Sequence, residues 1–299
     1  MKQMKRIKPI HKQFNVPPAF PFSFVYRDTK TKQRELPDHL HDWHEIVYVH
    51  GGKGIFFIDR TFYEMQAGSL FIIPGNTIHR AFPDATDPVT STAVFFNSAL
   101  VPQPSLGESF SYLQCFEWSR LNRTHHVLCG AGLQTSLEHC LREIDQELRA
   151  SEIGCRHAVA LQVQRILLLV GRETGAPALD RPNPPRAVGP AWMRDALLHI
   201  DAHYASEIGL GELSERAAVS PAHFSRVFRQ LTGMNVTGFI AAKRIVKAKQ
   251  LLLETGHNVA LIAAECGFES MPHFHRLFKR IVGQTPAAYR RGEIKNPAP

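Results

Sequence analysis

The sequence predicts an α+β multidomain protein: a β-barrel with two helices in the N-terminal part, then an all-α domain containing a tandem helix-turn-helix. Three observations predict this fold class. Short β-branched and aromatic segments, separated by turn residues, occupy residues 22–97. Helical periodicity dominates from residue 133 onward. Between these helices lies a proline-rich stretch, 175–190, which cannot form a regular helix and is typical of a linker.

Composition narrows the class of protein. The 299 residues suffice for two domains, and no apolar run is long enough to span a membrane, so no membrane partner is expected. Five cysteines form no C-x-x-C pair, which argues against a disulfide framework or structural zinc site and favours the reducing cytoplasm. The basic segment 1–12 lacks the apolar stretch of a signal peptide.

Positive charge is concentrated in the C-terminal third. The net charge is +8, and residues 191–299 hold 14 lysines and arginines against 9 aspartates and glutamates. Such an excess suits a polyanionic partner, although many soluble proteins are basic and charge alone is weak evidence.

The N-terminal pattern indicates closely spaced strands, which favour a small antiparallel barrel or jelly roll. The clearest strand candidates are residues 46–49, 55–58, 69–73 and 92–96. Residues 98–130 have no clear assignment. Two helices, 133–147 and 158–173, are predicted next, and they could pack on each other, on the barrel or on a second subunit.

A duplicated segment organises the C-terminal part. Residues 220–233 and 270–283 repeat serine, histidine, phenylalanine, arginine, a second phenylalanine and glycine in register. Each copy places apolar residues at i, i+3, i+4 and i+7, which is one stripe of a helix. Ser220 and Ser270 are placed to cap these helices, and a glycine ends each.

The opposite face of each copy is polar and basic and contains no carboxylate. A short helix with an apolar back and such a front suits a DNA major groove. An ordinary amphipathic surface helix would explain one copy, but two copies in register argue against that alternative. The outward positions are Ala222, Ser225, Arg226 and Arg229, then Pro272, His275, Arg276 and Lys279.

The order of helix, turn and duplicated helix occurs twice, which predicts a tandem helix-turn-helix. Further helices are expected at residues 192–204, 210–217, 235–254 and 259–266, with a short one opened by Thr285-Pro286. About 20 helical residues span about 30 Å, close to the roughly 34 Å between successive major grooves on one DNA face. The helix at 235–254 could therefore hold two reading helices at that separation.

Three C-terminal segments resemble the AraC/XylS family of bacterial transcription regulators: Ile262 to Ser270, His273 to Lys279, and Gly283 to Arg290. One departure is Met271-Pro272, where the family has polar residues. Through His39 to Ile46, then Gly68, Pro74 and His79, the N-terminal part is similar to the cupin domain often fused to these regulators. The resemblance implies a cupin-like effector-binding and dimerisation domain (1–174), a linker (175–190) and a tandem helix-turn-helix DNA-binding domain (191–292).

The resemblance assigns DNA-reading roles to the two helices. Arg226 and Arg276 can each make bidentate contacts to a guanine, worth about 1–3 kcal/mol of discrimination. Residues at the edges suit phosphate contacts, which position without specifying. Lys243 and Lys247, on the long helix, fit solvated charges as well as DNA ligands. The expected DNA-binding residues are Ala222, His223, Ser225, Arg226 and Arg229 in the first copy, and Met271, His273, His275, Arg276 and Lys279 in the second.

A histidine cluster is the candidate ligand site of the N-terminal part. His39, His41 and Glu45 share one parity along an expected strand, so their side chains can point to one side. With His79 they match the four-ligand set of metal-binding cupins, so a divalent metal such as iron, manganese, nickel or zinc is the one candidate cofactor. Two alternatives stay open: a polar floor for an organic ligand, and a purely structural cluster. His44 has the other parity and is expected outside.

The leading hypothesis is a cytoplasmic, sequence-specific DNA-binding regulator with no catalytic residues. The resemblance implies an activator that binds double-stranded DNA as a homodimer, contacts RNA polymerase and responds to a small-molecule effector, a sugar or related metabolite; the residues alone do not separate activation from repression. One alternative is a metal-dependent cupin enzyme with an accessory helical domain, resting on the histidine cluster. Another is a non-specific nucleic-acid binder, whose affinity would collapse with salt on every sequence alike.

Overall fold

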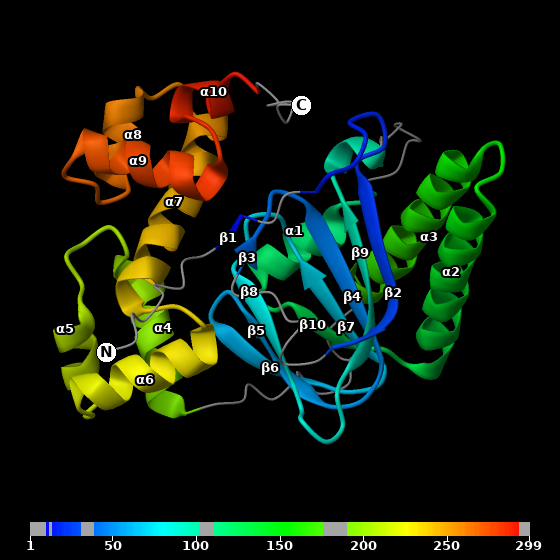
Figure 1. The fold of residues 1–299 in the computed structure, drawn as a ribbon, viewed down its shortest axis with the longest axis horizontal. Helices are drawn as coiled ribbons and strands as arrows, with labels where there is room; N and C mark the ends of the chain where they lie inside the picture. The colour runs from blue at the N-terminus through cyan, green and yellow to red at the C-terminus, as the bar shows by residue number, and fades with distance from the viewer. Residues whose placement is uncertain (1–9, 12–13, 31–38, 102–109, 176–189, 293–299) are drawn as a thin grey trace, which may run out of the picture.

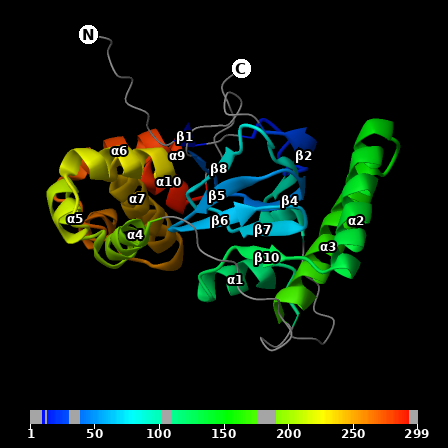
Figure 2. The ribbon, with the colours of Figure 1, turned by 90° about the horizontal axis from the view of Figure 1, so that it is seen from below.

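The predicted order of a strand-rich part followed by a helical part is confirmed. The computed structural model describes residues 10–11, 14–30, 39–101, 110–175 and 190–292. A β-barrel lies in the middle of the molecule, with the helices α2 and α3 on one side and the helical half, α4 to α10, on the other (Figures 1 and 2). No helix within those residue ranges is long and apolar enough to cross a membrane.

The barrel is a sandwich of two sheets. The first sheet has the strand order β1-β3-β8-β5-β6, and the second has β10-β7-β4-β9-β2. The strands are β1 Ile10–His11, β2 Phe22–Thr29, β3 His39–Leu40, β4 His44–Gly51, β5 Gly54–Ile58, β6 Thr61–Met65, β7 Ser69–Ile73, β8 His79–Pro83, β9 Thr90–Phe96 and β10 His126–Leu128. The four predicted strands correspond to β4, β5, β7 and β9.

Side chains alternate between the two faces of each strand, as the two-residue period requires. In β4, Val47 and Val49 point into the barrel and join a core that lies between the sheets. Ile46 and Tyr48 point outward and join a second core beneath α2 and α3. His44 also lies outside the barrel, against Phe116, with ring centroids 4.3 Å apart. Its predicted exclusion from the histidine cluster therefore agrees with the structure.

Three helices cover the outer face of the second sheet. They are α1 Gln114–Leu121, α2 Ala131–Ala150 and α3 Cys155–Gly175. Both predicted helices are present and extend further than the sequence indicated, whereas α1 and β10 fall in the unassigned segment. Leu141 and Ile144 of α2 are buried with Val163 and Ile166 of α3 in one apolar core, which explains the helix pair beside the barrel.

The helical half contains two similar modules joined by one long helix. Its helices are α4 Ala191–His203, α5 Leu210–Arg216, α6 Pro221–Thr232, α7 Val236–Glu254, α8 Val259–Glu265, α9 Met271–Val282 and α10 Pro286–Arg290. Each predicted helix of this region is present, with boundaries within two residues. Within the predicted linker, Gly175 ends α3 and Pro190 is the N-cap of α4; residues 176–189 lie outside the described residues.

The helical half packs on the outer face of the first sheet. Phe57 and Phe62 of this sheet belong to the same buried core as Phe239 of α7, and the Phe57 and Phe239 ring centroids are 6.1 Å apart. The two halves of the chain are thus in direct contact. Charged residues surround this apolar contact.

Candidate nucleic-acid interface and histidine cluster

The duplicated helices α6 and α9 have the same construction. Ser220 Oγ accepts a hydrogen bond from the His223 amide at 3.2 Å, and Ser270 Oγ accepts one from the His273 amide at 3.5 Å. Each helix ends at a glycine in the left-handed region, with φ of 76° in α6 and 85° in α9. These caps and stops are the ones predicted from the sequence, and they fix the start and length of both helices.

The predicted front faces point to solvent. Two phenylalanines hold the back of each helix in the core, Phe224 and Phe228 in α6 and Phe274 and Phe278 in α9. Most predicted DNA-binding residues are exposed, whereas Ser225 and Arg229 are half-buried: the exposed ones are Ala222, His223, Arg226, His273, His275, Arg276 and Lys279. Met271 differs, because its side chain is partly buried and packs against the core. Its apolar character at a position that is usually polar thus has a packing explanation.

Helix α7 joins the two modules and spans about 28 Å over its 19 residues. Arg244 of α7 fixes the second module to the first. Its guanidinium donates hydrogen bonds to the backbone oxygens of Tyr204 and Gly267 at 2.6 Å and of Ser206 at 2.9 Å. One side chain therefore ties the end of α4 to the turn before α9. No pattern in the sequence pointed to this role.

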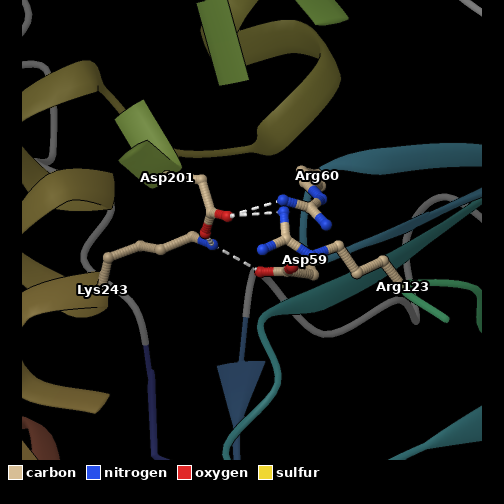
Figure 3. A network of polar contacts seen from close by, with 5 residues as sticks. All are labelled: Asp59, Arg60, Arg123, Asp201 and Lys243. Carbon is tan, nitrogen blue, oxygen red and sulfur yellow. Dashed lines mark hydrogen bonds and ion pairs between the residues drawn. The ribbon is translucent and has the colours of Figure 1, made fainter. Parts of the chain in front are cut away.

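From the sequence, Lys243 fitted either a DNA ligand or a solvated charge. In the structure it faces the barrel instead. Its Nζ lies 2.6 Å from Asp59 Oδ1 of the β5–β6 turn and 2.6 Å from Asp201 Oδ1 of α4. Arg60 Nη1 lies 2.6 Å from the other Asp201 oxygen, and Arg123 lies 3.8 Å from it. Figure 3 shows these five side chains converging from both halves of the chain. The network connects the barrel to α4 and α7.

Six residues further along α7, Lys249 is buried in the same interface. Its Nζ donates hydrogen bonds to the side-chain oxygens of Asp42 and Asn76, both in barrel loops. The ammonium also lies 5.2 Å from the centre of the Tyr289 ring. Burial lowers the pKa of Lys249, and Asp42 acts against this shift. Lys243 and Lys249 therefore dock one face of α7 on the barrel.

The histidine cluster forms, although not along one strand. The expected strand through His39 and Glu45 is wrong: β3 ends at Leu40 in the first sheet, and β4 begins at His44 in the second. The chain crosses between the sheets at residues 41–43, where Gly75 approaches so closely that a Cβ there would lie 2.3 Å from the Asp42 carbonyl oxygen. His41 and Glu45 still converge because both point into the sandwich.

Three members of the predicted set meet inside the barrel. Glu45 Oε2 lies 3.0 Å from His41 Nε2 and 2.9 Å from His79 Nε2, and all three side chains are buried. Burial would raise the pKa of Glu45, but the two imidazoles outweigh it and hold this pKa well below its usual value. The backbone of His39 pairs with that of His79; the His39 side chain lies outside the described residues.

The second nitrogen of each imidazole decides what the cluster can hold. His41 Nδ1 lies 2.8 Å from the Trp43 carbonyl oxygen, and His79 Nδ1 lies 2.9 Å from that of Thr77. A carbonyl only accepts, so both Nδ1 atoms carry the proton, and neutral rings would turn Nε2 lone pairs toward the carboxylate. Lone pairs on both Nε2 atoms would repel the carboxylate oxygen, and a cation between the three groups would remove this repulsion.

The donor set and its spacing fit a divalent metal. Two ligand atoms about 2.1 Å from one ion and at right angles to each other lie about 3.0 Å apart, which matches the two distances in this cluster. Backbone carbonyls that orient metal-bound imidazoles are the usual second layer of such sites. Two imidazoles and one carboxylate suit iron, manganese, nickel or zinc.

The cluster sits among aromatic rings inside the barrel. The Phe14 ring stacks on Trp43 at 4.2 Å and lies 5.1 Å from Phe95, while Phe56 lies 6.1 Å from the His79 ring. Phe56, Phe71 and Phe95 belong to the inner core. The three polar side chains are only 1–4% exposed.

A barrel with a buried polar cluster, followed by two helix-turn-helix modules with basic, exposed faces, defines the class of two-domain, DNA-binding transcription regulators. Two family models match the chain: an AraC-like ligand binding domain over residues 21–158 and a helix-turn-helix domain over residues 213–292. The chain belongs to the AraC family of transcription regulators. This is a family of regulators, not of cupin enzymes.

Curated relatives are similar along most of their length. The HTH-type transcriptional activator RhaS of Enterobacter sp. (strain 638) is 26% identical over 275 residues, covering 89% of this chain and 91% of that protein. RhaS of Escherichia coli (strain SE11) is 25% identical over 276 residues, with the same coverage.

Solved structures are also similar to this chain. The C-terminal domain of AraT, a response regulator from Geobacillus stearothermophilus, is 28% identical, with a TM-score of 0.34 over 37% of this chain and 92% of that one. ToxT from Vibrio cholerae is 11% identical, with a TM-score of 0.35 over 91% of this chain and 98% of that one. These TM-scores are too low to support a conclusion about geometry.

Proposed function

We propose that the chain reads a two-part operator through α6 and α9 and activates transcription in the bacterial cytoplasm in response to a small metabolite. The observation that carries the proposal is the matched pair of exposed basic faces, each fixed by the same cap, stop and buried phenylalanines. The RhaS relatives, called transcriptional activators, favour activation, and activation implies a contact with RNA polymerase. The family resemblance favours a sugar or related metabolite as effector.

Within this proposal, Arg226 and Arg276 read bases. Changing both to alanine should abolish operator preference in a gel-shift assay, since each bidentate contact to guanine contributes about 1–3 kcal/mol. The control is Lys53→Ala, which removes an exposed cation between β4 and β5. Operator sites are first obtained by selecting bound fragments from genomic DNA. If the double variant kept the wild-type preference, the assignment of α6 and α9 as readers would be wrong.

The flanking cations are proposed to contact phosphates. Lys279→Ala should weaken binding to all sequences alike and reduce the slope of log affinity against log salt by about 1. This measurement also separates the proposal from charge-driven, non-specific binding. In the non-specific case, the operator and unrelated DNA would lose affinity in parallel as salt rises.

The helix pair α2–α3 is proposed to form the homodimer contact. It projects on the side of the barrel opposite the helical half (Figure 2), and Ile153 and Leu161 are strongly exposed on it. Exposed apolar side chains on one projecting element favour a partner surface. Leu161→Glu should convert a dimer to a monomer in light scattering, whereas an unchanged mass would exclude this surface.

We further propose that His41, Glu45 and His79 bind one divalent metal, with His39 as a candidate fourth ligand. The proposal rests on the two Nδ1–carbonyl contacts, which turn both Nε2 atoms toward the carboxylate. A bound metal would stabilise the crossing between the two sheets. Metal analysis of dialysed protein should give about one equivalent, and Glu45→Gln should lose it together with the thermal shift that added Zn²⁺ produces. Sub-stoichiometric metal in wild type would leave a charged hydrogen-bond cluster instead.

A further inference from the structure

A cavity of about 460 Å³ lies between the barrel and the helical half, within the size range of small-molecule sites. We call it the interdomain cavity. Its walls come from both halves of the chain, so a molecule bound there would touch the barrel and α7 at once. The lining residues used below are Arg60, Arg120, Arg123, Asp59, Asp201, Tyr204, Lys243, Val246, Lys247, Lys249, Leu253, Glu254 and Tyr289.

The lining carries more positive than negative charge, with six lysines and arginines against three carboxylates. The carboxylates are already engaged. Asp59 and Asp201 accept from Lys243 and Arg60 in the network of Figure 3, and Glu254 accepts from the Gln250 amide. Lys249 is paired with Asp42, which lies outside this lining, so the excess positive charge belongs to Arg120, Arg123 and Lys247.

Three of the cations are available to a ligand. Arg120 makes a long hydrogen bond of 3.4 Å to the Gly75 carbonyl oxygen, Arg123 lies 3.8 Å from Asp201, and Lys247 donates to the neutral Gln250. Arg120 belongs to α1 and Lys247 to α7, on walls from the two halves of the chain. Guanidinium and ammonium groups arranged in this way favour carboxylate or phosphate oxygens.

The same lining also has apolar surface. Val246 and Leu253 of α7 and the rings of Tyr204 and Tyr289 contribute to it, and Leu253 is 62% exposed although it lies beside a packed interface. An inorganic ion would leave this apolar surface exposed to water, whereas the carbon skeleton of a metabolite would bury it.

We propose that the interdomain cavity binds a small organic anion, a carboxylate or a phosphate ester, held by Arg120, Arg123 and Lys247 against Val246 and Leu253. A ligand that contacts both walls binds the docked arrangement of the two halves more tightly than an undocked one, and it therefore shifts the population toward docking. This site is separate from the histidine cluster and from the DNA-reading faces. It gives the chain a second input acting directly on α7.

Calorimetric titration of the full chain tests the proposal at constant ionic strength. The probes are citrate for the carboxylate arm, glucose 6-phosphate for the phosphate-ester arm, and glucose as the neutral comparison. We expect saturable binding of at least one anion and none of glucose. The anion that binds identifies the chemical source.

The variant Arg120→Gln/Arg123→Gln should weaken anion binding at least tenfold. Both side chains are exposed, so the fold should persist, and circular dichroism checks it. The charge-matched control Lys53→Gln/Arg172→Gln removes two exposed cations that do not line the cavity, and it should bind within twofold of wild type. Absence of saturable binding for both anions, or an equal loss in test and control variants, would overturn the proposal. This titration tests anion binding only. Either result is therefore independent of the proposed DNA-reading role of α6 and α9.

Discussion

The two outer faces of the barrel are covered by different chemistry. On the second sheet, α2 and α3 bury aliphatic side chains such as Leu141 and Ile144. On the first sheet, the helical half buries an apolar contact around Phe57 and surrounds it with ion pairs of Lys243 and Lys249. One cover is an ordinary hydrophobic core, and the other is an interface whose strength depends on charge.

This difference indicates which cover can respond to a signal. Apolar burial depends little on pH or on small ions, and it is lost only when the core opens. A buried ion pair balances a large desolvation cost against Coulomb attraction, so a modest change in either one shifts the balance. The first sheet packs on the helical half, which contains α6 and α9, the proposed DNA-reading helices. We therefore expect regulation to act there, while α2 and α3 keep the barrel intact.

The largest expected effect comes from leaving a buried charge without its partner. Asp42→Ala should lower the free energy of unfolding by about 3–5 kcal/mol, because Lys249, only 1% exposed, would keep only Asn76 and the Tyr289 ring. Adding Lys249→Met should recover most of the loss, since a methionine needs no counter-charge. Urea unfolding measures both variants, with the exposed Glu64→Ala as control. A cost below about 1 kcal/mol for Asp42→Ala would mean that this pair does not hold the interface.

On the α2–α3 side, removing apolar volume should lower the free energy of unfolding slightly less, and the loss should not depend on salt concentration. Leu141→Ala should destabilise the chain by about 3 kcal/mol through lost burial and a residual cavity, since Leu141 is 2% exposed. The difference from wild type should be the same at low and high salt. Leu121→Ala, at an 83% exposed position of α1, should have little effect. A strongly salt-dependent Leu141→Ala cost would remove the contrast between the covers.

The apolar cover was predictable and the charged one was not, for a physical reason. Period 3.6 places Leu137, Leu141 and Ile144 on one face, so sequence alone indicates burial. An ion pair has no period. Lys243 and Asp59 are separated by 184 positions, and only the folded chain brings them together. From the sequence, Lys243 fitted a solvated charge or a DNA ligand equally well.

The candidate sites divide in the same way. The reading helices follow from local signals, since Ser220 and Gly233 fix the ends of α6 and its apolar stripe fixes its orientation. The histidine cluster was predicted from parity along a strand that the structure breaks at residues 41–43. His41 and Glu45 still meet because both ends of the crossing face the barrel interior. Arg244 went unnoticed, because its partners are backbone oxygens, which carry no sequence signal.

The docking of the charged cover should depend on pH. Burial would raise the pKa of Asp59, but the Lys243 charge and hydrogen bond lower it; burial would lower the pKa of Lys243, but Asp59 and Asp201 raise it. The Asp59 contribution is therefore present above about pH 4 and lost as pH falls through its lowered pKa. The Lys243 contribution is present below about pH 10 and lost as pH rises through its raised pKa.

Asp59→Asn tests this window. It should cost about 1.5–3 kcal/mol near pH 7, as expected for a hydrogen bond to a charged group, and the cost should shrink toward pH 3. Unfolding by urea at several pH values gives the comparison with wild type, and Leu141→Ala serves as the pH-independent control. If the Asp59→Asn cost were the same at pH 3 and pH 7, the carboxylate charge would not contribute to docking.

The smallest effect is expected at the edge of the network. Arg123 is 66% exposed and lies 3.8 Å from Asp201, whereas Arg60 is 9% exposed and lies 2.6 Å from it. Exposed ion pairs contribute about 0–1 kcal/mol because water screens them and the side chain loses entropy. Arg123→Gln should therefore leave the urea midpoint nearly unchanged, while Arg60→Gln lowers it clearly. Because Arg123 contributes so little to stability, its guanidinium can bind an anion in the interdomain cavity. A loss of anion binding in Arg123→Gln would then come from the missing anion contact and not from a destabilised fold.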